Sequence, residues 1–461
     1  TADEIRVIYF FYQGCRSSSR GRECPAEGFV DLGKPPADDE DVISRGARRL
    51  QAYFNDRFQT YGRRVHFWVW YEGDFTAEGL RAHALEHLKL IDPFAVVHGI
   101  TATEYTEVMA RRGVLTFNSA VGTPAAFFRK YPKLMWSYLP SMELHARSYS
   151  SMICKQVVGR PVAFSGNAGD NGKPRVLGML RPDPDAGGYG PELSNFADRV
   201  RAEVEACGGS FAVVANTPNG GQVGTTENEK EAQFTQNMAE MSQKGVTTLI
   251  WAWGFDLGRN SSAAARQGYF PEWILSGDNI MDGYDLGQVQ DQQEFDGHAW
   301  IQTVQARSPA FSQDLCYSAM LEADPDTPEE DAALLCRLHL AYEAFRQLFV
   351  GIQVAGPKLG PATIDKGYHA IPPGPSQTPF VPACYYEPGD YTCIKDATAM
   401  YWDRNGQAPG AQSPGCWRMP DDGKRYTWDE WPEQDISARR RPDRDPCNGY
   451  SSLSVNVNAG V

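Results

Sequence analysis

The chain contains 461 residues, of which 42% are hydrophobic and 22% are charged, and its 44 Lys and Arg residues are outnumbered by 58 Asp and Glu residues. A formal net charge of -14 argues against a function that depends on neutralising phosphate groups. Neither nucleic acid nor an anionic membrane surface is therefore an expected partner. The length allows two or three domains of about 150 residues each, and no run of about 18 apolar residues predicts a membrane-spanning helix.

The first 120 residues alternate between short apolar strands and amphipathic helices. The strands are predicted at 5–12, 65–71, 94–98 and 114–117, and the helices between them at 43–58, 80–91 and 103–112. Apolar residues recur in the helices at intervals of three and four, which is the spacing of one helical face. This alternation predicts a doubly wound α/β lobe.

Residues 175–215 give the clearest unit of this kind. A strand at 175–180 is followed by an Asp/Pro/Gly loop at 183–190, a helix at 193–207 and a continuously apolar strand at 211–215. Strands without a polar face are typical of a parallel sheet covered on both sides. The loop follows the carboxyl end of a strand, where open α/β sheets bind ligands, but no G-x-G-x-x-G motif marks it as a dinucleotide loop.

The alternation begins again after residue 140, with a helix through Cys154 and later strands at 248–253 and 273–276. After a predicted helix at 328–350 the chain becomes less regular, and beyond residue 405 we expect an irregular, disulfide-stapled tail. The sequence therefore predicts an α/β protein with two three-layer (αβα) lobes joined by a multi-strand hinge. We expect the first lobe to contain residues 1–139 and about 280–375, and the second residues 140–279 and about 376–461.

Ten cysteines, an even number, favour disulfide bonds outside the cytoplasm. Proximity in the sequence suggests four bridges, which are Cys15 with Cys24, Cys316 with Cys336, Cys384 with Cys393 and Cys416 with Cys447. Cys154 and Cys207, which end two predicted helices of one lobe, are left for a fifth bridge. No pair has the C-x-x-C spacing of a zinc site. Because the chain starts with Thr1, Ala2 and two acids instead of a signal sequence, we expect a mature exported protein.

Several short phrases, taken in order, resemble the type I periplasmic binding proteins, in particular the branched-chain amino-acid-like substrate-binding proteins of ABC importers. The phrases are VHGITAT at 97–103, LTFNSA at 115–120, GYG at 188–190, CGG at 207–209, GDYT at 389–392 and KDA at 395–397, and the resemblance covers residues 3–403. It implies an extracytoplasmic solute-binding protein whose lobes close on a small organic ligand. The ligand would be an amino acid, an aromatic acid or a related metabolite. A monomer without a cofactor would deliver it to an ABC permease.

Candidate ligand-binding residues lie at the ends of the predicted strands. Hydroxyls at a helix amino terminus, where N–H groups are free, can hold a carboxylate or another acceptor, and Thr101, Thr103 and Ser119 occupy such positions. The resemblance implies that they hold the acid group of the ligand and that Tyr189 closes over it. Helix capping is the alternative for the hydroxyls, and local packing is the alternative for Tyr189. The other candidates are Tyr12, Gln13, Ile100, Asn118, Trp253, Asp256, Asp278 and Asn279.

Two alternative functions belong to other classes. His83, Glu86 and His87 match the H-x-x-E-H pattern of inverted zinc peptidases, which places two imidazoles four residues apart on one helix. Zinc chemistry would require a third ligand and an open position for water, and we favour a chance match on a half-exposed helix. The second alternative is a ligand-sensing or sequestering protein with the same fold and no transporter. Along the strand at 248–253, we expect Trp253 to face the cleft and Trp251 to face the core.

Overall fold

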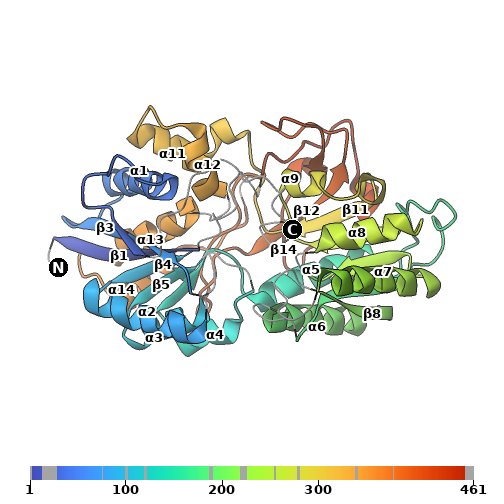
Figure 1. Ribbon diagram of the computed structural model, residues 1–461, viewed down its shortest axis with the longest axis horizontal. Coiled ribbons are helices and arrows are strands. Elements are labelled where there is room, and N and C mark those ends of the chain that lie inside the picture. Colours follow the sequence, from blue (N-terminus) through green and yellow to red (C-terminus); the bar gives the residue numbers. More distant parts are fainter. Residues whose placement is uncertain are drawn as a thin grey trace.

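The computed structural model describes residues 3–12, 28–74, 76–98, 102–118, 122–185, 190–218, 226–253, 256–277, 281–337, 341–376 and 378–451. Two β-sheets lie at opposite ends of the long axis, and helices cover both of them (Figure 1). The predicted α/β class with two three-layer lobes is therefore confirmed.

The first sheet has the strand order β2-β3-β1-β4-β5-β6. Its strands are β1 (Glu4–Tyr12), β2 (Gly28–Asp31), β3 (Arg64–Glu72), β4 (Ala95–His98), β5 (Leu115–Asn118) and β6 (Met135–Ser137). All neighbours pair in parallel except β2, which runs antiparallel to β3. The order grows outward from β1 in both directions, which is the doubly wound arrangement.

Helices cover the two faces of this sheet. On one face lie α2 (Ala77–Leu90) and α3 (Thr103–Arg111), and on the other lie α1 (Val42–Arg57), α13 (Ala341–Ala355) and α14 (Pro361–Tyr368). Successive residues of a strand point to opposite faces, so Ile8 and Phe10 pack with Tyr105 of α3, whereas Val7 and Tyr9 pack with Phe345 of α13. The remaining helices of this lobe are α4 (Ala125–Lys130), α11 (Leu315–Ala323) and α12 (Glu329–Arg337).

The second sheet has the order β13-β12-β11-β10-β9-β7-β8. Its strands are β7 (Leu177–Pro182), β8 (Phe211–Thr217), β9 (Thr248–Trp251), β10 (Glu272–Ser276), β11 (Ala299–Thr303), β12 (Asp396–Asp403) and β13 (Cys416–Arg418). The strands from β11 to β8 are parallel, whereas β12 is antiparallel to both of its neighbours. The two-residue strand β14 (Tyr426–Thr427) pairs with the start of β12.

The helices of the second lobe also divide between two faces. α5 (Met142–Gln156) and α6 (Gly190–Ala206) pack on one face, and α7 (Glu227–Gln243) and α8 (Leu257–Arg266) pack on the other. Short helices α9 (Tyr284–Gln288) and α10 (Gln292–Phe295) follow β10. The tail contains β13, β14 and the 3-10 turns Pro420–Gly423 and Ile436–Arg439, so it is more ordered than the sequence suggested.

The position of β11 corrects one lobe boundary. This strand pairs in parallel with β10 and antiparallel with β12, so it belongs to the second sheet. Residues 281–303, which were expected in the first lobe, therefore lie in the second, and the chain returns to the first lobe after residue 303. The helix expected at 328–350 corresponds to α12 and α13, and residues 338–340 between them lie outside the described residues.

The chain crosses between the lobes after β6, after β11 and before β12. The first and third crossings are joined by main-chain hydrogen bonds, in which Cys393 N donates to Ser137 O at 2.9 Å and Ile394 N donates to Tyr138 O at 3.1 Å. Arg425 of the tail joins the second and third crossings through its guanidinium group. The hinge is therefore a small hydrogen-bonded structure made of several strands.

Four disulfides are present among the described residues. Cys154–Cys207 joins α5 to the end of α6, Cys316–Cys336 joins α11 to α12, Cys384–Cys393 closes a loop before β12, and Cys416–Cys447 closes the tail. These are the pairs expected from the sequence, and Cys15 and Cys24 lie outside the described residues. Bridges of this kind stabilise a fold mainly by restricting the unfolded chain.

Candidate functional site

The candidate site lies where strands of the two sheets end. Strands β1, β4 and β5 are in register, with Phe10 beside His98 and His98 beside Asn118, so the loops that follow them leave from one edge of the first sheet. In the second sheet β7, β9 and β10 are parallel neighbours and also end at one edge. Carboxyl edges of this kind are the usual ligand-binding positions of open α/β sheets.

The two edges meet in the structure. A Cβ atom added to Gly122, which follows β5, would lie 3.0 Å from Cη2 of Trp253, which follows β9. Nearby, the Ala125 N–H at the start of α4 donates to Oε2 of Glu143 in α5 at 2.7 Å. Gly122 and Ala125 belong to the first lobe, whereas Trp253 and Glu143 belong to the second. The candidate site is therefore an interface between the lobes.

Most of the predicted ligand-binding residues lie outside the described residues. These are Gln13, Ile100, Thr101, Ser119, Tyr189, Asp278 and Asn279. Tyr12 and Asn118 are the last residues of β1 and β5, which places their backbone at the edge of the first sheet. Thr103, Trp253 and Asp256 are described fully, and the other positions remain predictions.

Thr103 is the first residue of α3 and is half-buried. The N-cap position belongs to Ala102, which makes no side-chain hydrogen bond to the helix. Thr103 is therefore not the capping residue that the alternative interpretation required. The first N–H groups of α3 lack a cap from this position, which suits an acceptor placed at the helix amino terminus.

Trp253 is buried, at 5% exposure, and has an unusual backbone conformation with φ +71°. A positive φ is costly for a bulky residue and is found mainly where the surrounding structure imposes it. Its ring packs edge-on against Phe196 at 5.3 Å between centroids and against His145 at 6.0 Å. Trp251, two residues earlier, is fully buried with the residues under α7 and α8. Only Trp253 therefore reaches the interface with the other lobe.

His145 packs against the ring of Trp253, and the sequence analysis did not identify it as a site residue. Its Nε2 atom lies 3.2 Å from Oε1 of Gln302 and 3.3 Å from Oγ of Ser276. Burial lowers the pKa of His145 to about 4, so the imidazole is neutral at ordinary pH. The ring thus holds the carboxyl ends of β10 and β11 together beneath the interface between lobes.

Asp256 is a buried carboxyl at the N-cap position of α8, with 3% exposure. Burial raises its pKa, and the nearby cations Arg259 and Lys230 oppose this effect. Its Oδ2 atom has no hydrogen-bond partner among the described residues. A buried carboxyl with a free oxygen can accept a hydrogen bond from an amino or hydroxyl group.

The geometry of the H-x-x-E-H motif differs from a zinc site. His83 Nδ1 lies 3.0 Å from Oε2 of Glu72, and His87 Nδ1 lies 2.8 Å from the hydroxyl of Tyr105. α2 is half-exposed as expected, because Glu86 lies on its exposed side, whereas His87 lies on its buried side and is fully buried. Burial lowers the pKa of His87 to about 3. Both histidines therefore already serve as hydrogen-bond partners in the packing of α2.

Within the described ranges, the one group of three His, Cys, Asp or Glu side chains close enough to share a metal ion is Asp314 with Cys316 and Cys336. The two cysteines are joined in a disulfide, which removes the thiolates that would bind a metal.

We therefore expect elemental analysis of the purified protein to find clearly less than one zinc ion per chain, and EDTA to leave its melting temperature unchanged. One zinc ion per chain that is lost on His87→Ala would instead establish the zinc alternative.

No protein family and no curated protein matches the sequence. The fold is nevertheless similar to solved structures of solute-binding proteins. The leucine-, isoleucine-, valine-, threonine- and alanine-binding protein from Brucella ovis, in a closed conformation, matches with a TM-score of 0.61 and 12% identity over 95% of this chain and 100% of its own. A solute-binding protein of an ABC transporter from R. palustris, in complex with 4-hydroxybenzoate, matches with a TM-score of 0.59 and 12% identity over 94% and 98%.

A third structure extends the same result. The ABC transporter substrate-binding protein from Desulfitobacterium hafniense, in complex with Leu, matches with a TM-score of 0.54 and 13% identity over 90% of this chain and 100% of its own. At identities this low, the structural matches establish the fold alone. The resemblance to type I periplasmic binding proteins is confirmed at the level of the fold. No helix in the described part of the chain is both long and apolar enough to cross a membrane.

Proposed function

We propose that the protein is an extracytoplasmic solute-binding protein that holds a small organic molecule between its lobes and delivers it to an ABC importer. The observation that carries this proposal is the meeting of two strand-end edges, from two doubly wound lobes, at Gly122 and Trp253. A location outside the cytoplasm is supported by the four disulfides among the described residues.

The proposed ligand class is an amino acid, an aromatic acid or a related metabolite. Solved structures of similar fold contain Leu in one case and 4-hydroxybenzoate in another. The start of α3 at Thr103, which the N-cap residue Ala102 does not cap with its side chain, suits a carboxylate. Trp253 offers an aromatic wall, and Oδ2 of Asp256, which no described residue hydrogen-bonds, offers an acceptor for an amino or hydroxyl group.

Ligand capture would operate by closure of the lobes about the three crossings. A ligand that contacts both lobes stabilises the closed arrangement, because its contacts with the second lobe exist only there. In the present arrangement Trp253 is buried against Gly122, which is the kind of contact that forms when the lobes approach. The closed form would then be the state recognised by the permease.

The test is a ligand screen followed by a single substitution. Thermal shift and tryptophan fluorescence should identify at least one stabilising compound among the amino acids, 4-hydroxybenzoate and other aromatic acids. Tyr189→Ala is expected to weaken that compound about tenfold or more, since truncating a central aromatic contact typically costs about 2 kcal/mol. Calorimetric titration of both proteins measures the change.

Tyr61→Ala is the matched control, because Tyr61 is an exposed tyrosine in the turn before β3, at the far end of that strand from the candidate site. It should bind the compound with the affinity of the unaltered protein. If no compound raises the melting temperature, or if Tyr189→Ala binds as tightly as Tyr61→Ala, the proposed site is wrong.

A further inference from the structure

We propose that the hinge contains a second small-molecule site, separate in its residues from the strand-end site, that accepts an uncharged ring compound with one polar group. The cavity has a volume of about 520 Å³, which lies within the range of about 300–1,000 Å³ that is usual for ligand pockets. Its walls come from the first two crossings, α13, the loop at 380–384 and the tail at 449–451.

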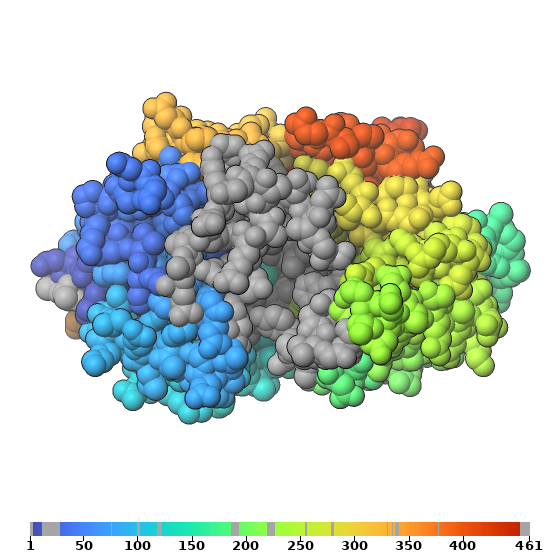
Figure 2. Space-filling model, viewed as in Figure 1, coloured from blue at the N-terminus to red at the C-terminus, as the bar shows by residue number. Residues whose placement is uncertain are grey.

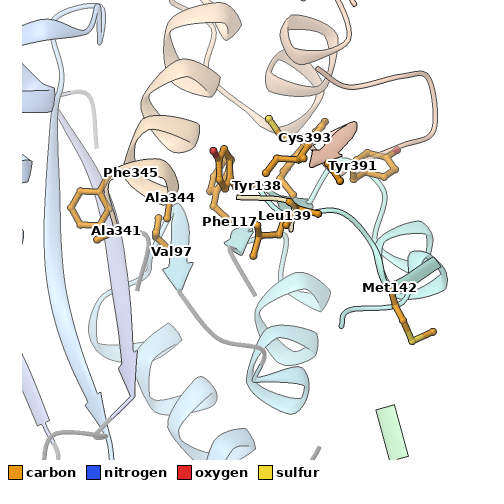
Figure 3. Close-up of a cluster of buried hydrophobic side chains, with 14 of the residues drawn as sticks. Val97, Phe117, Tyr138, Leu139, Met142, Ala341, Ala344, Phe345, Tyr391 and Cys393 are labelled. Carbon is orange, nitrogen blue, oxygen red and sulfur yellow. The ribbon is translucent and has the colours of Figure 1, made fainter. Parts of the chain in front are cut away.

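The cavity lies between parts of the chain that are far apart in sequence. Figure 2 shows the tail beside the segment that contains α11 and α12, along one edge of the molecule, and Gly449 N donates to Ser308 O at 2.9 Å across this junction. In Figure 3 the ring of Tyr138 stands between α13 and the third crossing. A molecule in the cavity would therefore contact Tyr138 of the first crossing and Gln305 of the second.

The walls are rich in rings, and the mouth is apolar. Phe311, Tyr342 and Tyr450 line the interior. Leu315, Phe380 and Val381 also line the cavity, and they are among the large apolar side chains that remain exposed, at 60%, 45% and 51%. Exposed apolar side chains gathered around a cavity are typical of a binding site and uncommon elsewhere on a surface.

The charged residues of the lining already have partners. Arg346 Nη2 lies 2.6 Å from Oε2 of Glu343, and Arg307 forms an ion pair with Asp422. Asp314 caps α11 by accepting the N–H of Cys316 at 2.8 Å. A charged ligand would therefore enter without a free counter-charge, and burial of an unpaired charge is unfavourable. The lining selects an uncharged molecule.

Tyr138 supplies the polar contact. Its side chain lines the cavity and is 6% exposed, and its hydroxyl has no hydrogen-bond partner among the described residues. Burial raises the pKa of Tyr138, so the phenol stays neutral and can donate a hydrogen bond. A ligand that carries a hydroxyl or carbonyl oxygen could accept this hydrogen bond.

The test uses 4-fluorophenol as an uncharged probe and 4-fluorobenzoate as a charged probe of similar size, both followed by fluorine NMR. We expect 4-fluorophenol to bind, and Ala306→Phe, which fills the cavity from the second crossing, to abolish this binding. Tyr138→Phe should weaken it roughly five- to tenfold through loss of one hydrogen bond. Any binding of 4-fluorobenzoate should survive Ala306→Phe, because that probe would occupy another site.

Val381→Trp at the mouth provides a second variant that leaves the interior intact, and Leu90→Trp, on the exposed side of α2, is its matched control. Val381→Trp should reduce 4-fluorophenol binding at least fivefold, whereas Leu90→Trp and Tyr189→Ala should not change it. The proposal is overturned if the unaltered protein does not bind 4-fluorophenol, if both cavity variants bind it normally, or if they weaken 4-fluorobenzoate equally. The Tyr189→Ala result separates failure here from failure of the proposed function.

Discussion

Arg425→Leu is expected to lower the free energy of unfolding by about 3–5 kcal/mol, because it removes one partner of a buried ion pair. The guanidinium group is 1% exposed and donates to Oδ1 of Asp396 at 2.8 Å. It also donates to the carbonyls of Gln305 at 2.6 Å, Val304 at 2.8 Å and Asp396 at 2.9 Å. One side chain of the tail thus fixes the second crossing to the third.

The effect should concentrate at the hinge. Burial raises the pKa of Asp396, and Arg425 opposes that shift, so the variant leaves a buried carboxyl without its cation. Calorimetry should show a melting temperature lower by roughly 3–5 °C, because the unfolding entropy of a chain of 461 residues gives about 1 °C per kcal/mol. Hydrogen exchange should show faster exchange at Ile394, whose N–H bonds Tyr138 O across the first and third crossings.

Arg404→Leu is the control for this prediction. Its guanidinium group is 54% exposed and pairs with Asp296 at 3.1 Å, so its loss should change stability by no more than about 1 kcal/mol. Equal destabilisation by the two variants would show that burial of the Arg425 pair is not what stabilises the hinge.

The alternating part of the fold was predictable because its signals are local. Strand and helix periodicities identified β1, β3, β4, β5, β7 and β8, with ends that differ by at most two residues from those in the structure. β12 was missed because Asp396 begins it and Lys395 directly precedes it, so that its start reads as a polar loop. These charges are buried only because Asp390 and Arg425 neutralise them, and the Arg425 pairing depends on the tertiary structure.

The positions of candidate site residues that directly follow strands were predictable from the sequence, whereas residues that pack behind the strand ends were not. Thr103 and Trp253 could be placed after strands because each follows a short apolar run, β4 in the first sheet and β9 in the second, and their contact with a ligand stays a prediction. His145 was missed because its partners Gln302 and Ser276 are 157 and 131 residues away in the chain. A histidine on a helix face otherwise occupied by Tyr149 and Met152 was the available signal, and that pattern does not reveal what the histidine contacts.

Arg175→Leu is expected to destabilise the second lobe by about 3–5 kcal/mol, again by breaking a buried ion pair. The Arg175 side chain is 2% exposed, and the carboxylate of Glu272 is fully buried. Nε of Arg175 donates to Oε2 of Glu272 at 2.7 Å, and Nη1 donates to Asp435 at 2.7 Å. The guanidinium group therefore joins the start of β10 to the tail, and urea denaturation of the variant measures its contribution.

Two comparisons decide whether the unpaired carboxylate is the cause. Arg147→Leu also breaks an ion pair between the second lobe and the tail, but Arg147 and Asp429 are 53% and 61% exposed, so the loss should be no more than about 1 kcal/mol. Adding Glu272→Gln to Arg175→Leu removes the buried charge and keeps an acceptor for the Ala163 N–H, which Glu272 binds at 2.7 Å. The double variant should therefore be more stable than Arg175→Leu alone, because an uncompensated charge costs more than an unpaired amide. If the double variant is less stable, the stability of this lobe depends on the hydrogen bonds of Glu272 more than on its neutralisation.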